Sequence, residues 1–247
     1  MSTGSEPRLI GVGMGPGDPE LVTVRGVRAL REAPAIVVPV LDTGEQGRAE
    51  ATVRQHVPGG KLVRVVFALN ERTDRARREA AWDAAGERVA ALLREHGTVA
   101  FATIGDPNVY STFGYLAQTV TGLLPGVRIE TVPGITAMQD LAARSGAVLT
   151  EGTEPLTLVP VTAGSGVLRA ALDGPGTVVA YKFGRRAGEV AQALRDTGRL
   201  ADAVWGASLG LPGESIRPAA DLAGAGPLPY LATLLAPPRR TTRGGKL

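Results

Sequence analysis

The sequence of 247 residues contains no cysteine, which excludes disulfides, thiolate metal sites and thiol nucleophiles. Histidine is scarce as well, because only His56 and His96 occur and their spacing matches no zinc motif. We expect both histidines to be surface residues and the protein to bind no metal. The lack of cysteine also fits a reducing compartment.

Long apolar runs are absent. No stretch approaches the roughly 20 apolar residues that a membrane span needs, and the opening MSTGSEPR has no apolar core of signal-peptide length. Aromatic residues make up only 4%, and they are not interleaved with basic residues as in a platform for single-stranded nucleic acid. We therefore expect a cytoplasmic protein with neither a membrane nor a nucleic acid as its partner.

Charge is present in both signs, with a formal net charge of +3 at pH 7. A basic excess favours an anionic small molecule, nucleic acid or an acidic membrane surface as partner. Part of the excess lies in the C-terminal sequence PPRRTTRGGKL, and we expect residues 238–247 to be a disordered, solvated tail that binds nothing.

What the sequence has in quantity is an alternation of short apolar runs and amphipathic segments, which predicts an α/β fold. The expected strands are residues 8–13, 35–40, 61–67, 98–104, 127–132, 156–161, 177–183, 203–209 and 229–235. The expected helices are residues 21–31, 82–96, 135–144, 166–172 and 187–195, whereas residues 42–50 read as a polar loop.

The sequence Leu-Leu-Pro-Gly at residues 123–126 reads as a hinge or a short connection. It predicts two α/β lobes with an active-site cleft between them. The N-terminal lobe is expected at residues 1–124 and the C-terminal lobe at residues 125–237.

The stretch 98–116, TVAFATIGDPNVYSTFGYL, reads as a buried strand, a tight loop and the start of a helix. Ligands of open α/β sheets bind just past the carboxyl end of a strand, where the loop Gly105-Asp106-Pro107 falls. Asp106 has the alternative role of capping the following helix. Three hydroxyls, those of Tyr110, Ser111 and Thr112, are expected on the first turn of that helix as a wall of the ligand site.

The stretch GVGMGPGD at residues 11–18 resembles a dinucleotide-binding loop but fails its Gly-x-Gly-x-x-Gly spacing, because the sixth position is Pro16 or Asp18 in the two possible registers. The phosphate-binding Walker loop is absent too, since Gly60-Lys61 is followed by Leu62. A purely structural turn is one interpretation. The density of glycine beside the single acid favours a close approach of the backbone to a ligand.

Three segments in order, GVGMGPGDPELVTVRG, TIGDPNVYSTFGYL and VPGITAMQDLAARSG, resemble the tetrapyrrole methylases of the cobalamin and sirohaem pathways. The resemblance continues through VVAYKFGR at residues 178–185 to PYLATLLAPPRR at residues 229–240. Within the family, the sequence after Gly-Asp-Pro and the PYLATL ending look most like the precorrin-2 C(20)-methyltransferases.

The resemblance implies an enzyme of two α/β lobes, a homodimer, that uses S-adenosyl-L-methionine (SAM) as methyl donor and a polyanionic tetrapyrrole as substrate. It places the SAM contacts at Pro16, Gly105, Asp106, Val109, Ser111, Thr112, Thr136, Ala137, Lys182 and Ser208. The Ser208 assignment departs from the family pattern, since Trp205-Gly206-Ala207-Ser208 stands where relatives often have a charged residue.

The implied reaction is methylation of C-20 of precorrin-2 to precorrin-3A, in which the enzyme mainly holds two reactants in line. Asp18 and Tyr110 are the candidates for assisting proton removal, and substrate carboxylates are expected on arginines such as Arg25, Arg28, Arg48, Arg185 or Arg186. The alternatives are cobalt-precorrin-2 as substrate, another ring carbon, or a non-catalytic sensor of SAM or tetrapyrrole. A nicotinamide oxidoreductase is disfavoured by the failed dinucleotide motif.

Overall fold

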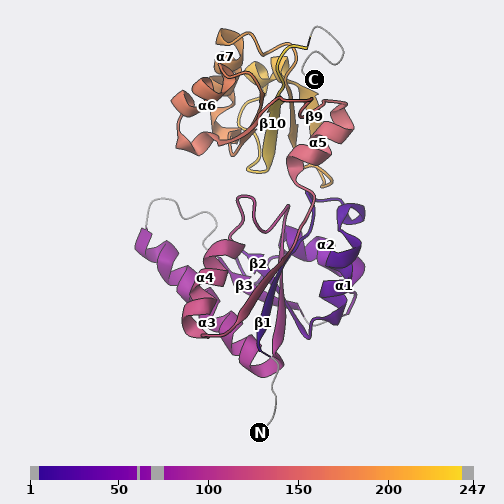
Figure 1. Ribbon diagram of the computed structural model, residues 1–247, viewed down its shortest axis with the longest axis vertical. Coiled ribbons are helices and arrows are strands. Elements are labelled where there is room, and N and C mark those ends of the chain that lie inside the picture. The colour runs from indigo at the N-terminus through magenta and orange to yellow at the C-terminus, as the bar shows by residue number, and fades with distance from the viewer. Residues whose placement is uncertain (1–5, 60–61, 68–74, 241–247) are drawn as a thin grey trace. The chain divides into compact units, whose positions relative to one another are not determined.

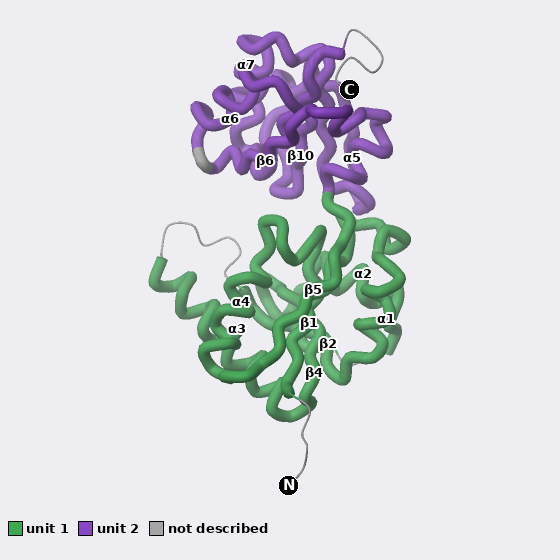
Figure 2. The backbone as a smooth tube through the Cα atoms, viewed as in Figure 1, with its two compact units in different colours: residues 1–136 green, residues 137–247 purple. Residues whose placement is uncertain are grey.

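The computed structural model describes residues 6–59, 62–67 and 75–240. The chain divides into two compact units, Met1–Thr136 and Ala137–Leu247 (Figure 2). Each unit is built on one five-stranded sheet with helices on both faces, as Figure 1 shows. Among the described residues, no helix combines the length and the apolar character that crossing a bilayer requires.

The first unit contains a wholly parallel sheet with the strand order β3-β2-β4-β1-β5. Its strands are β1 (Arg8–Gly13), β2 (Ala35–Val40), β3 (Leu62–Val66), β4 (Thr98–Thr103) and β5 (Arg128–Val132). Its helices are η1 (Pro19–Leu21), α1 (Val24–Glu32), α2 (Arg48–His56), α3 (Arg75–His96) and α4 (Phe113–Leu123).

Alternating strand residues of the first sheet point into two separate apolar cores. Val37, Val99 and Phe101 pack with α3 and α4 on one face. Ile36 and Val38 pack with α1 and α2 on the other. Because a parallel sheet is covered on both faces, its strands read as nearly continuous apolar runs, which explains why β1, β2 and β4 were predictable from sequence.

The second unit has a mixed sheet with the order β6-β7-β10-β8-β9, in which β10 is antiparallel to β7 and β8. Its strands are β6 (Leu156–Pro160), β7 (Thr177–Tyr181), β8 (Val204–Ala207), β9 (Ser215–Pro218) and β10 (Ala232–Ala236). Its helices are α5 (Ala137–Ser145), η2 (Val161–Ala163), α6 (Ser165–Leu172), η3 (Gly184–Arg186), α7 (Ala187–Asp196) and η4 (Ala219–Gly224). Helices α6 and α7 pack on one face of the sheet, and α5 packs on the other.

Three elements differ most from the sequence-based expectation. Helix α3 begins at Arg75, seven residues before the start expected at residue 82. The polar loop expected at residues 42–50 ends early, because α2 begins at Arg48 and buries Ala49 and Val53 in the core. The short strand β9 was not anticipated, because its sequence SIRP has no apolar run and the strand forms by pairing with β8 at the edge of the sheet.

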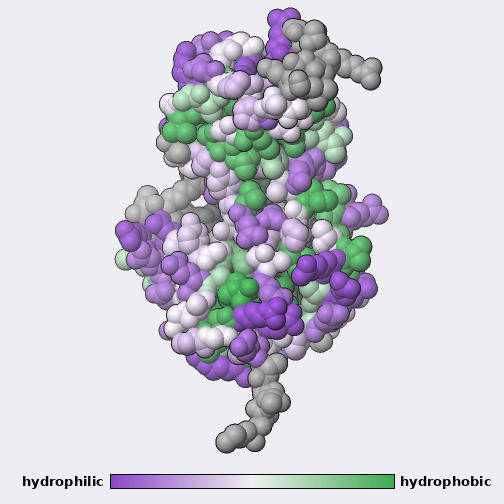
Figure 3. Space-filling view, viewed as in Figure 1, coloured by the Kyte–Doolittle hydropathy of each residue, from purple (hydrophilic) through white to green (hydrophobic). Residues whose placement is uncertain are grey.

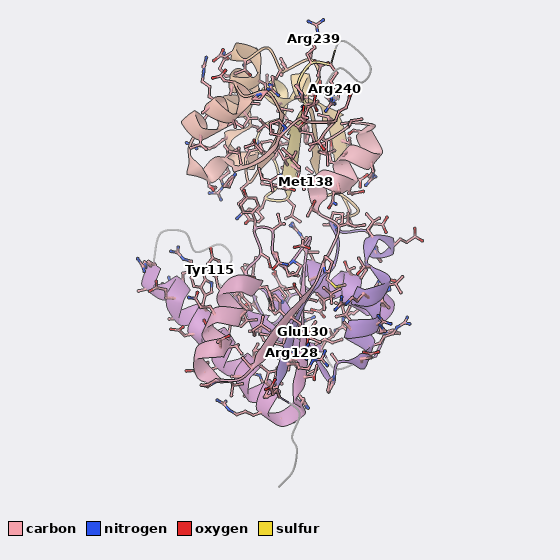
Figure 4. The ribbon with its side chains drawn as sticks, viewed as in Figure 1. Tyr115, Arg128, Glu130, Met138, Arg239 and Arg240 are labelled. Carbon is pink, nitrogen blue, oxygen red and sulfur yellow. The ribbon has the colours of Figure 1, made fainter. Side chains whose placement is uncertain are left out.

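The division between the units also lies later than the expected boundary at residues 124 and 125. Strand β5 follows that boundary in sequence, yet it pairs in register with β1 and completes the first sheet. Its exposed start is held there by Glu130, which accepts hydrogen bonds from Arg8 and forms an ion pair with Arg128. Figure 4 shows Arg128 and Glu130 side by side on this strand.

The C-terminal segment is anchored as far as Arg240, contrary to the expectation of a solvated tail from residue 238. The Arg240 guanidinium donates to the buried carboxylate of Glu154, with an Nη2–Oε2 distance of 2.5 Å, and to the Val148 carbonyl. Residues 241–247, the rest of the predicted tail, lie outside the described residues.

Candidate functional site

Three loops meet at the carboxyl ends of the neighbouring strands β4, β1 and β5 in the first unit. The Gly105 amide donates to the Gly15 carbonyl at 2.7 Å, which joins the β4 loop to the β1 loop. The Gly134 amide donates to Asp106 Oδ2 at 2.9 Å, which joins the β5 loop to the β4 loop. The predicted ligand loop is therefore the centre of a three-loop edge.

Glycine is required where these loops touch. A Cβ on Gly134 would lie 2.1 Å from the Gly105 carbonyl oxygen, and a Cβ on Gly13 would lie 2.5 Å from the Gly134 Cα. Gly105 differs, because it adopts φ +71° and a Cβ built there meets no atom within 4 Å. The Cα of Gly105 thus faces open space on the side where a side chain would stand, which leaves room for a ligand close to the backbone.

Asp106 is buried and links two loops instead of capping the next helix. Its Oδ1 accepts from the Asn108 amide at 2.8 Å while its Oδ2 accepts from Gly134. Helix α4 has Thr112 as its N-cap residue, so the capping role expected for Asp106 is wrong. The carboxylate instead holds the loop that carries Gly105 against the β5 loop.

The three predicted hydroxyls precede α4 and do not form its first turn. Ser111 Oγ lies 3.0 Å from Thr103 Oγ1 and accepts from the Phe113 amide at 3.1 Å, so it ties the loop to the end of β4. Tyr110 has φ +51°, a left-handed conformation that is uncommon for a residue with a side chain. Partial burial raises the pKa of its phenol, so the hydroxyl keeps its proton at neutral pH.

The remaining predicted residues of the first unit lie on the same three loops. Pro16 is buried in the β1 loop, and the Asp18 carboxylate accepts from the Glu20 amide at 2.9 Å, which caps η1. Val109 donates its amide to the Asp106 carbonyl. Thr136 is buried at the end of the β5 loop.

The predicted residues of the second unit gather at the corresponding strand ends. Lys182 follows β7 with φ +59°, and Ser208 follows β8 with φ +52°. Ala137 begins α5, and the amide of the next residue, Met138, donates to the Tyr181 hydroxyl at 3.3 Å. Met138 is labelled in Figure 4 at the start of α5.

Two residues that contact the β1 loop were not identified from the sequence. His56 Nε2 lies 2.9 Å from the Pro19 carbonyl oxygen, and Thr52 is buried near the Gly17 carbonyl. Both residues belong to α2, whose start had been read as loop, so no pattern connected them with the glycine-rich segment.

Acidic and histidine side chains do not converge in the part of the chain that the structure describes, where no group of three suits a metal ion. The site is instead made of backbone amides and carbonyls, hydroxyls and one buried carboxylate. Such a set can bind a polar, zwitterionic ligand without a dedicated charged partner.

Comparison with known proteins identifies the family. The model of the family Tetrapyrrole (Corrin/Porphyrin) Methylases matches residues 8–223. A precorrin-2 C(20)-methyltransferase of Sinorhizobium sp is 33% identical over 206 residues, which cover 80% of this chain and 82% of that protein. A cobalt-precorrin-2 C(20)-methyltransferase of Salmonella typhimurium is 29% identical over 230 residues, 92% of this chain and 95% of that protein.

A solved structure supports the same assignment. The uroporphyrin-III C-methyl transferase of Thermus thermophilus, complexed with S-adenosylhomocysteine, superposes with a TM-score of 0.64 at 26% identity, covering 93% of this chain and 97% of that one. The α/β fold with two sheets and the family predicted from the glycine-rich segments are thereby confirmed. The chain belongs to the tetrapyrrole (corrin/porphyrin) methylases.

Proposed function

We propose that the protein transfers a methyl group from SAM to C-20 of precorrin-2, giving precorrin-3A and S-adenosylhomocysteine. The observation that carries the proposal is the similarity to a precorrin-2 C(20)-methyltransferase over four fifths of both chains. We further propose a homodimer, as the family resemblance implies, and a cytoplasmic location, as expected from the sequence.

The three-loop edge supports SAM as the donor. The open space at Gly105 suits a backbone contact, and the neighbouring Ser111 and Thr112 add hydroxyls. The SAM contacts that we propose are Pro16, Gly105, Asp106, Val109, Ser111, Thr112, Thr136, Ala137, Lys182 and Ser208. SAM supplies an activated methyl group on a sulfonium, so the protein mainly has to orient the two reactants.

Exposed apolar side chains in the first unit gather at the carboxyl edge of its sheet. Figure 3 shows that hydrophilic residues cover much of the visible face of this unit, with hydrophobic patches between them. Five of the six exposed large apolar residues described there end or follow a strand, or lie in the first turn of a helix, at this edge, and only Leu123 lies at the far end of α4. The five are Val24, Leu41, Val66, Tyr110 and Tyr115. Concentrated apolar exposure favours a flat, partly apolar ligand such as a tetrapyrrole.

Two arginines at the same edge lie at the N-terminal ends of helices, where positive charge is disfavoured. Arg25 lies in the first turn of α1, which has no acidic residue there, and Arg48 begins α2. A cation near a helix N-terminus is unfavourable, because that end carries partial positive charge. The arrangement suits a ligand with several carboxylates, and we propose Arg25 and Arg48 as their partners. Arg186 is less suitable, because it pairs with Glu189 and donates to the Val161 carbonyl.

Asp18 and Tyr110 remain the proposed residues for the proton that leaves the methylated carbon, and their side chains suit different roles. A tyrosine hydroxyl is protonated at neutral pH, and burial raises the pKa of Tyr110 further, so this hydroxyl can donate a hydrogen bond but does not accept the proton. We therefore propose that the Asp18 carboxylate accepts the proton.

The test is mass spectrometry of precorrin-2 incubated anaerobically with the protein and SAM, followed by NMR of the product made with a ¹³C-labelled methyl group. One added methyl at C-20 is expected. The same assay with cobalt-precorrin-2 tests the alternative that the Salmonella relative suggests. A methyl group at another carbon, or bound SAM that is never consumed, would contradict the proposal in favour of a different methylase or a sensor.

A further inference from the structure

Helix α5 is tied at both of its ends to strand ends of the second sheet. At its start, the Met138 amide donates to the hydroxyl of Tyr181, the residue before Lys182. Near its end, the Arg144 guanidinium makes a two-pronged contact with the Glu214 carboxylate, with an Nη1–Oε2 distance of 2.5 Å. The helix therefore spans from β7 to the connection between β8 and β9.

The same Glu214 carboxylate also holds the backbone of that connection. Its Oε2 accepts from the Gly210 amide at 2.7 Å. Within the loop, the Leu211 amide donates to the Ser208 carbonyl and the Glu214 amide donates to the Leu211 carbonyl. Glu214 thus closes the loop that begins with Ser208, and Arg144 fastens the closed loop to α5.

Apolar packing reinforces this connection from the inside. Leu141 of α5 and Leu209 of the loop are both buried, at 0% and 3% exposure. They pack over Gly206, where an added Cβ would come within 2.9 Å of each. Because this space is filled, the loop cannot shift against α5 without opening the core.

The ion pair itself lies near the surface, with 37% of the Arg144 side chain and 29% of the Glu214 side chain exposed. Such pairs usually add little to global stability. A bidentate contact nevertheless fixes the relative orientation of the two side chains, because both hydrogen bonds form only in one orientation of the guanidinium. The pair is thus better suited to setting the position of the loop than to holding the unit folded.

We infer that Arg144 and Glu214 are positioning residues that set the spacing between the start of α5, at Ala137, and the left-handed residue Ser208. This spacing would match two of the three cofactor contacts proposed in the second unit, the third being Lys182. The inference rests on the proposed SAM-dependent function, and it adds two residues that do not themselves touch the cofactor.

The test compares Glu214→Ala with a matched ion-pair control by calorimetric titration with S-adenosylhomocysteine. The control is Asp196→Ala, which removes the exposed Arg169–Asp196 pair between α6 and α7, 2.9 Å apart. Glu214→Ala is expected to weaken binding about tenfold or more, since small displacements in a site have large effects. Asp196→Ala should leave affinity unchanged, and the two variants should have similar melting temperatures.

Conservative variants separate the two contacts of Glu214. Glu214→Gln keeps an oxygen for the Gly210 amide and loses the charge, so its affinity should lie between those of wild type and Glu214→Ala. Arg144→Leu also removes the ion pair with the buried Asp140, 3.7 Å away, so it should bind no better than Glu214→Gln, and the double variant Arg144→Leu/Glu214→Gln should be no worse than Arg144→Leu alone. In turnover assays, KM for SAM should rise while KM for the tetrapyrrole stays constant.

The outcomes distinguish this inference from the proposed function. Wild-type affinity in Glu214→Ala, or an equal loss in Asp196→Ala, would overturn the positioning role even in an active methyltransferase. A protein that binds S-adenosylhomocysteine with the expected pattern of variants but adds no methyl to precorrin-2 would overturn the proposed reaction and leave the positioning role intact.

Discussion

At the scale of single residues, Gly134 has the least room for a side chain among the glycines of the three-loop edge. Replacing it by alanine would place a Cβ 2.1 Å from the Gly105 carbonyl and 2.8 Å from Gly13 Cα. Both neighbours are backbone atoms, so the loops must separate. We expect Gly134→Ala to lower the free energy of unfolding by about 2–3 kcal/mol and to abolish binding of S-adenosylhomocysteine, measured by denaturation and calorimetry.

Gly114→Ala is the matched control. Gly114 is exposed in α4, and an added Cβ would meet no atom within 4 Å. Alanine should raise stability by up to about 1 kcal/mol because it favours a helix more than glycine does. Affinity for S-adenosylhomocysteine should not change. Wild-type affinity in Gly134→Ala would show that the loops tolerate separation.

The carboxylate of Glu50 makes the free energy of unfolding depend on pH in the acid range. Its side chain is fully buried and accepts hydrogen bonds from Arg64 and Arg54 at 2.7–2.9 Å. The Arg64 guanidinium, with Arg54, holds the pKa of Glu50 below its ordinary value of 4.5. A carboxyl with a lowered pKa in the folded state contributes stability above its unfolded pKa, and this contribution is lost as the pH falls through the folded value.

We therefore expect wild type to lose stability more steeply than Glu50→Gln when the pH falls below about 4.5. At pH 7, Glu50→Gln should be less stable by about 2 kcal/mol, because hydrogen bonds to a charged group are lost. Urea denaturation between pH 3 and pH 7 measures both effects. Glu79→Gln, in the exposed Arg75–Glu79 pair, should behave as wild type. Parallel pH curves for wild type and Glu50→Gln would refute the assignment.

At the scale of secondary-structure elements, α3 and α4 are joined by an aromatic stack. The rings of Trp82 and Tyr115 lie 4.6 Å apart and nearly parallel, and Arg78 lies 5.6 Å from the Trp82 ring centre. Tyr115, labelled in Figure 4, is half exposed.

Tyr115→Ala should lower the free energy of unfolding by about 1 kcal/mol and shift Trp82 fluorescence to the red, whereas Tyr115→Phe should do neither. Measurement in a Trp205→Phe background isolates Trp82, and an unshifted spectrum in Tyr115→Ala would contradict the stack.

The sequence predicted elements well where one local pattern decided them. Strand β2 lies at residues 35–40 as expected, since a buried parallel strand is a continuous apolar run. Pattern reading failed where a distant partner decides the structure. Strand β9 exists through pairing with β8, and β5 belongs to the first sheet through its register with β1.

The candidate site could be predicted as a location but not as a network. Gly105 could be placed because strand ends followed by Gly-Asp-Pro are recognisable ligand positions. The bond from Gly134 to Asp106 joins residues 28 positions apart, and no periodicity reports such a contact. The same holds for Arg144 and Glu214, which are 70 positions apart.

At the scale of the whole molecule, the basic balance of the chain predicts different salt responses for the two ligands. Binding of a polycarboxylate tetrapyrrole by arginines depends on charge interactions that salt screens, whereas SAM is expected to bind mainly to backbone groups. Raising the salt concentration from about 0.05 M to 0.5 M, over which the Debye length shortens several-fold, should weaken tetrapyrrole binding more than binding of S-adenosylhomocysteine. Parallel titrations by fluorescence and calorimetry test this expectation. Equal salt sensitivity would contradict arginine recognition of the substrate.

The left-handed backbones of Tyr110, Lys182 and Ser208 have a consequence for protein engineering. Glycine adopts this conformation at no steric cost, so each residue is held at a cost of about 1 kcal/mol that glycine would remove. In a library of variants screened for heat resistance, glycine should be enriched at all three positions. When the same library is screened for turnover, the native side chains should be kept at these positions. A position where the two screens select different residues would then be one whose side chain is needed for the reaction.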